Sequence, residues 1–250
     1  SITFTAQIKA EGDAKRGLEI ATEADRRSNG FIDSSATMKM ILKNRHGESS
    51  SRELRVQSME VDNDGDKSMT IFDTPADVKG TALLTFSHRI ENDDQWLYLP
   101  ALKRVKRMSS SNKSGPFMGS EFAFEDIGSQ EVDKYSWTYL KDEILDGVDC
   151  FVLERIPVDQ KSGYTKQILW LNKAEYYPLK IDFYDRKSSL LKTLFNSQYK
   201  LYKDKFWRAH LMEMTNHQTG KSTDLVWDDI HFGNDFSDSD FSTNSLKRSK

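Results

Sequence analysis

Few residues of this chain have the types and spacing that chemistry at a protein site requires. Asp229 and His231 alternate within a predicted strand, so their side chains would share one face, as two ligands of a metal ion can. No third ligand is located beside them, and the other four histidines are scattered along the chain. We therefore predict the solvated end of a strand here, and no metal site.

Two short motifs imitate ligand-binding loops. The acidic segment 62–66 resembles the start of a calcium loop, but its glycine is fourth instead of sixth, and its twelfth residue is Asp73 instead of glutamate. Residues 219–223, TGKST, resemble the end of a phosphate-binding loop, but Thr215 stands where the leading glycine is needed, and predicted strands flank the motif. We predict that both segments are turns.

Signatures of common hydrolases are missing from the sequence as well. It contains neither a G-x-S-x-G nor an H-E-x-x-H motif. With 39 acidic residues, a glycosidase-type pair of carboxylates is neither located nor ruled out. We expect a protein that is not an enzyme and that uses no cofactor.

Composition narrows the classes of partner. The formal net charge of −3 and the pI near 6.0 do not suit general binding of polyanions, so we expect no nucleic-acid partner. Cys150 is the single cysteine, which prevents an internal disulfide, and its apolar neighbours predict a buried thiol. The sequence has no apolar run long enough to span a membrane and no signal peptide at its start.

The segment 94–127 has the most unusual pattern. A short strand, Gln95–Leu99, ends at Pro100 and is followed by a basic strip, which we define as Lys103, Arg104, Lys106 and Arg107. A loop rich in serine, asparagine and glycine then leads to four large apolar residues, Phe117, Met118, Phe122 and Phe124. Two interpretations stay open: these side chains pack under the loop as a small core, or they form a hinged flap that contacts an apolar ligand.

The elements around this segment are mostly predicted strands. Residues 1–12 show no period and are expected to be a flexible leader, and a helix capped by Asp13 should place Leu18, Ala21 and Ala24 on one face. Residues 13–250 should form a single mainly β domain whose strands, at hairpin spacing, build one curled antiparallel sheet. The polar tail after Gly233 holds Phe236, Phe241 and Leu246 as candidate docking residues.

The string WLYLPALKRVKR, followed by SSSNKSG, FMGS and F-x-F-E-D, resembles the bacterial family of outer-membrane lipoprotein-sorting proteins, which is distantly similar to the periplasmic carrier LolA. The resemblance extends from about Ala14 to Arg248. It implies a LolA/LolB-like open half-barrel of about eleven strands, with an N-terminal helix and short helices over the concave face. It also implies a periplasmic location, an inner-membrane transporter as donor and an outer-membrane acceptor.

Three functions compete at this stage. The first is a monomeric, non-enzymatic periplasmic carrier or binder of lipoprotein or lipid acyl chains, and the second is an envelope interaction module, accessory to a transporter, that docks through the basic strip. The third, and least favoured, is a hydrolase. The basic strip is the predicted contact with a partner or with the membrane surface. Without the resemblance, ordinary core packing would be the preferred interpretation of the apolar residues that we predict to bind lipid, which are Met38, Met40, Leu42, Leu54, Val56, Ile71, Trp96, Tyr98, Phe117, Met118, Phe122 and Phe124.

Overall fold

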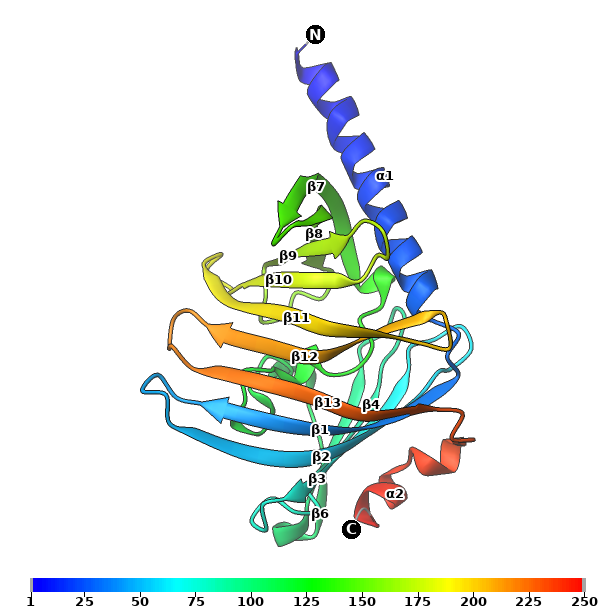
Figure 1. Ribbon diagram of the computed structural model, residues 1–250, viewed down its shortest axis with the longest axis vertical. Helices are drawn as coiled ribbons and strands as arrows, with labels where there is room; N and C mark the ends of the chain where they lie inside the picture. Colours follow the sequence, from blue (N-terminus) through cyan, green and yellow to red (C-terminus); the bar gives the residue numbers. More distant parts are fainter. Residues whose placement is uncertain (1, 249–250) are drawn as a thin grey trace.

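A computed structural model describes residues 2–248 and shows one open antiparallel sheet of thirteen strands (Figure 1). The predicted mainly β half-barrel with an N-terminal helix is confirmed, with thirteen strands where about eleven were expected. The helices are α1 (Ile2–Ser28) and α2 (Thr243–Lys247). The strands are β1 (Asp33–Lys43), β2 (Ser49–Met59), β3 (Lys67–Thr74), β4 (Ala82–Phe86), β5 (Asp94–Leu99), β6 (Arg104–Arg107), β7 (Tyr135–Leu145), β8 (Val148–Pro157), β9 (Lys166–Asn172), β10 (Pro178–Tyr184), β11 (Leu190–Tyr202), β12 (Phe206–Asn216) and β13 (Ser222–Phe232).

The sheet consists of two meanders joined in the middle. Strands β1 to β6 follow one another in one direction, β13 to β7 follow in the other, and β1 pairs with β13. Strands β6 and β7 therefore form the two opposite edges, although they are consecutive in the sequence. The connection between them, residues 108–134, must cross from one edge of the sheet to the other.

This connection crosses the inner, concave face of the sheet and packs against residues of both meanders. It contains the short 3-10 turns Ser110–Asn112, Phe117–Gly119, Phe124–Asp126 and Val132–Lys134. Phe117, which is 1% exposed, packs its ring against Phe72 of β3 at 5.7 Å between centroids and against Phe124 at 5.6 Å. In the described structure Phe117 is therefore a core residue, and of the two interpretations given for this segment the structure shows the packed one.

Strand alternation sorts the remaining apolar residues between the two faces. Met38, Met40 and Leu54 are buried against the 108–134 connection on the inner face. On the outer face, Phe241 and Leu246 of the C-terminal segment are 1% and 0% exposed and pack on β3 and β4. The tail residues that the sequence marked as docking points thus cover the outer face of the first meander.

Helix α1 begins much earlier than the sequence indicated. Residues 2–12, predicted to be a flexible leader, form its first turns, because strong helix formers such as Ala6, Gln7 and Ala10 outweigh the lack of an apolar period. The side chains described in this part of α1 are exposed, and the helix extends beyond the sheet (Figure 1). Leu18, predicted to face the core, is 48% exposed.

Candidate functional site

A cavity of 550 Å³ lies between the second half of α1 and the inner face of strands β7 to β12. Its volume falls within the roughly 300–1,000 Å³ range of small-molecule sites. Most of its wall is apolar or aromatic, and these residues are Ala21, Ala24, Val132, Trp137, Leu169, Leu171, Tyr176, Tyr177, Pro178, Tyr199, Trp207, Ala209 and Met212. Such a wall suits a ligand with a long apolar part.

Gly17 sets the distance between α1 and the sheet. A Cβ atom at this position would lie 2.7 Å from the backbone nitrogen of Tyr139 in β7, so only glycine permits this approach. The Arg16 guanidinium lies 3.9 Å from the centroid of the Tyr139 ring, and Ile20 and Ala21 are buried one turn further on. The helix is thus fixed at its middle, and its next turns form the roof of the cavity.

Aromatic side chains gather on one side of the cavity. The rings of Tyr177 and Tyr199 stack with centroids 3.9 Å apart, and Trp207 lies 5.5 Å from Tyr177. Trp207 also donates a hydrogen bond of 3.1 Å from Nε1 to Glu175. Burial raises the pKa of the Tyr199 phenol, which keeps this wall neutral. Aromatic groups with one polar end are typical of places where an apolar surface meets water.

Two arginines line the cavity without an acidic partner. Arg155 of β8 is 7% exposed, and it donates two hydrogen bonds, of 2.9 and 2.6 Å, to the neutral side-chain oxygen of Gln167. Arg208 of β12 donates to the carbonyl oxygens of Trp207 and Ser28, and burial lowers its pKa. Within residues 2–248, no carboxylate lies within 4.0 Å of either guanidinium.

The cavity wall also holds an unsatisfied acceptor. Asn196 of β11 is 7% exposed, and its side-chain oxygen has no hydrogen-bond partner among the described residues. A buried polar atom without a partner costs about 1–3 kcal/mol of folding free energy. This oxygen has less than 1 Å² of accessible surface, so protein atoms enclose it and it does not face the cavity.

The cavity wall does not include any of the apolar residues predicted to bind lipid. Met38, Met40, Leu42, Leu54, Val56, Phe117, Met118, Phe122 and Phe124 belong to the inner core, which the 108–134 connection covers. Ile71, Trp96 and Tyr98 lie on the outer face with Phe241 and Leu246, so these three cannot share one concave surface with the others. Lipid contact at all twelve residues stays a prediction that the structure does not test.

The basic strip lies on the free edge of the sheet. Lys103 ends a short turn with a φ of 50°, and Arg104, Lys106 and Arg107 are exposed on edge strand β6. Arg107 also pairs with Asp94 of β5, so it has a structural role. The other three charges contact no acidic group within the described residues.

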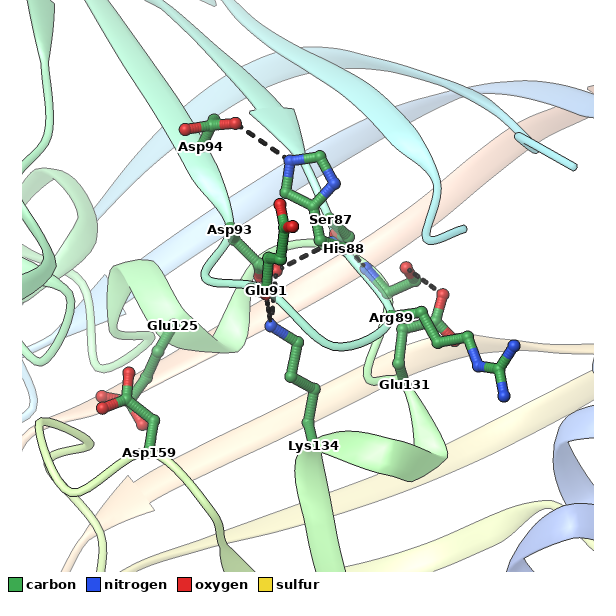
Figure 2. Close-up of polar contacts among 12 residues, drawn as sticks. Ser87, His88, Arg89, Glu91, Asp93, Asp94, Glu125, Glu131, Lys134 and Asp159 are labelled. Atoms are coloured by element: carbon green, nitrogen blue, oxygen red, sulfur yellow. Dashed lines mark hydrogen bonds and ion pairs between the residues drawn. The ribbon is translucent and has the colours of Figure 1, made fainter. Parts of the chain in front are cut away.

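A histidine between two carboxylates lies close to this edge, and no pattern in the sequence indicated it. His88 pairs through Nδ1 with Asp64 at 2.8 Å and through Nε2 with Asp94 at 2.9 Å, and Figure 2 shows it beside Asp94. Burial lowers the pKa of His88, but the two hydrogen-bonded carboxylates outweigh burial and raise it overall. Asp64 comes from the segment that imitates a calcium loop, which is a turn that packs against Ser87.

The chemical motifs of the sequence take no part in a site. Residues 2–248 contain no group of three or more His, Cys, Asp or Glu side chains that could hold a metal ion. Asp229 and His231 are exposed near the end of β13, and residues 217–221 form the turn before β13. Cys150 is fully buried, and burial raises the pKa of its thiol. No helix in the described part of the chain has the length and apolar character of a membrane span.

The chain is similar to several solved proteins along almost its whole length. A domain from Vibrio parahaemolyticus, described as an outer membrane lipoprotein-sorting protein, is 62% identical, with a TM-score of 0.92 and coverage of 94% of this chain and 100% of that one. A DUF1329 family protein from Desulfovibrio piger is 32% identical, with a TM-score of 0.89 and coverage of 94% and 99%.

A more distant structure shares the fold. A LolA superfamily protein from Nitrosomonas europaea is 22% identical, with a TM-score of 0.75 and coverage of 92% of this chain and 98% of that one. A family model described as an uncharacterized protein matches residues 64–248, and no protein of curated function matches.

Proposed function

This chain belongs to the DUF1329 family of outer-membrane lipoprotein-sorting proteins with a LolA-like fold, and from that premise we propose that it is a non-enzymatic carrier of lipid or lipoprotein acyl chains. The observation that carries the proposal is the 550 Å³ cavity between α1 and the second meander. Its apolar wall matches the chemistry of an acyl chain. The periplasm is the compartment in which such a carrier would work.

The free energy of transfer indicates how such a carrier works. Burying about a dozen methylene groups at ~0.8 kcal/mol each stabilises the complex by roughly 10 kcal/mol, which keeps the chain out of water. A bilayer offers the same chain a comparable environment, so release needs a change in the protein. Helix α1 is the element that can provide this change, because it forms the roof of the cavity and contacts the sheet mainly around Gly17 and Ile20.

Filling the cavity tests this function. The Ala24→Trp variant places an indole in the roof and should abolish saturable binding of the fluorescent probe N-phenylnaphthylamine and of palmitate. The Thr22→Trp variant introduces the same side chain at an exposed position of the same helix, outside the cavity wall, and should bind like the parent. Mass spectrometry of the native protein should detect a co-purifying lipid in the parent and in Thr22→Trp only. Unchanged binding by Ala24→Trp contradicts the proposal.

The exposed edge of β6 supports a docking role beside the carrier function. Lys103, Arg104 and Lys106 project from a free sheet edge without acidic partners in the described chain, and basic groups of this kind attract anionic membrane surfaces. We propose that this edge brings the carrier to a membrane. If the cavity binds no lipid, docking through this edge is the main function, as in an accessory module of an envelope transporter.

A further inference from the structure

The charges in the cavity wall are unbalanced. Five basic side chains, Arg26, Arg27, Arg155, Lys205 and Arg208, and three acidic ones, Asp25, Glu175 and Asp204, line the cavity of a chain whose net charge is negative. Arg26 and Arg27 are already paired with Glu23, at 2.7 and 2.8 Å. The other three cations, Arg155, Lys205 and Arg208, have no carboxylate within 4.0 Å among the described residues.

Arg155 is a buried cation that has no carboxylate partner, and such an environment favours the binding of an anion. It shares strand parity with Phe151 and Leu153, which places it on the inner face, and its guanidinium lies 4.4 Å from the Tyr135 ring and 5.7 Å from the Trp137 ring. Gln167, which is 2% exposed, fixes the guanidinium in this position. A buried charge is normally paired with an opposite charge, and a guanidinium can bind two oxygens of an oxyanion at once.

From these positions we infer that the cavity selects acyl ligands that carry a negatively charged oxyanion, with Arg155 as its binding partner. The inference rests on the proposed carrier function and adds the class of ligand. Arg208, at the cavity and close to exposed residues of α1, supplies a second positive charge. The acyl chain occupies the apolar wall under α1, and a free small anion would use only a fraction of that surface.

Competition against the uncharged probe N-phenylnaphthylamine tests the inference. Palmitate should displace the probe at a concentration at least roughly tenfold lower than methyl palmitate, because only the carboxylate forms a charge-assisted pair with Arg155. Inorganic phosphate alone should not displace it. Equal potency of palmitate and its methyl ester overturns the inference but leaves the carrier function standing, whereas a chain that binds none of these probes contradicts both. Displacement by phosphate alone also overturns the inference.

Variants locate the effect at Arg155. Arg155→Met should keep the affinity for the uncharged probe but lose the preference for palmitate, and Arg155→Lys should retain part of it. Arg186→Met is the matched control, because Arg186, like Arg155, donates to neutral oxygens and forms no ion pair with a described carboxylate, but it lies outside the cavity. An Arg155→Met variant that binds the uncharged probe and still prefers palmitate contradicts the role of Arg155.

Discussion

The side chains of Lys192 and Asp126 form a buried ion pair of 2.9 Å that joins the middle of the sheet to the 108–134 connection. Their side chains are 5% and 9% exposed, and Asp126 also accepts the Tyr164 hydroxyl at 2.8 Å and the backbone N–H of Ala123 at 2.7 Å. The pair holds the connection on the concave face. The same connection reaches the cavity wall further on, through Gln130 and Val132.

Removing Lys192 should therefore destabilise the protein strongly. We expect Lys192→Met to lower the free energy of unfolding by about 3 kcal/mol, because it leaves the Asp126 carboxylate buried without its cation. Urea unfolding measures the loss. Lys200→Met, on an exposed position of the same strand, should change stability by less than about 0.5 kcal/mol. Combining Lys192→Met with Asp126→Asn should recover part of the loss, and a single variant as stable as Lys200→Met would show that the pair contributes little.

The sequence predicted the parts of this fold that depend on local patterns. Alternation located most strands, and the apolar side chains of Phe241 and Leu246 marked the docking of the C-terminal segment. The position of the cavity depends instead on β6 and β7 lying at opposite edges and on which part of the sheet the connection covers. No local pattern carries that information. Arg155 could have been noticed in the sequence, because it is an arginine at an inward position of a strand. The pairing of His88 with Asp64 could not, because it joins two loops that are distant in sequence.

Stability should fall as the pH rises toward neutral. Burial, together with the neighbouring charges of Glu131, Glu60 and Asp25, raises the pKa of the half-buried Asp66 to about 7 from its ordinary value of 3.8. Between these values the folded protein keeps a proton that the unfolded chain releases, so the stabilisation present at low pH is lost as the pH rises through about 7. The pKa of His88 is also raised, so the loss of its proton lowers the free energy of unfolding in the same direction as the pH rises.

Urea unfolding of the parent at about pH 5 and about pH 8 measures this dependence. Asp66→Asn removes the titrating group and should reduce the difference in unfolding free energy between the two pH values. Asp62→Asn, an exposed position in the same turn, should leave the difference as in the parent. A pH dependence that is the same in all three proteins would assign the effect to other groups.

Reversing the charge of the basic strip should weaken contact with anionic membranes. At about 1 kcal/mol for each basic group near the surface, changing Lys103, Arg104 and Lys106 to Glu should lower vesicle binding by roughly a hundredfold or more, and the remaining binding should depend less on salt. Sedimentation with vesicles that contain anionic phospholipid measures this. Arg107 is left intact because it pairs with Asp94.

Two measurements accompany the strip variant. Reversal of the exposed lysines Lys187, Lys200 and Lys203 makes the same change in net charge elsewhere on the surface and should weaken vesicle binding far less. Thermal unfolding of both variants should match that of the parent, because surface substitutions cost little stability. Equal loss of vesicle binding in both variants would attribute the effect to net charge and not to the strip.

The contact at Gly17 should control both the position of α1 and the affinity for lipid. In Gly17→Val the new side chain would collide with the backbone of Thr138 and Tyr139, at 2.7 to 2.9 Å from its Cβ atom, so α1 must move off β7 and the roof of the cavity moves with it. We expect a loss of about 1–3 kcal/mol in stability and a clear loss of N-phenylnaphthylamine binding. Gly12→Ala, in the same helix with nothing within 4 Å of its Cβ, should bind like the parent and gain up to about 1 kcal/mol. Probe binding by Gly17→Val at parental affinity would show that α1 does not close the cavity.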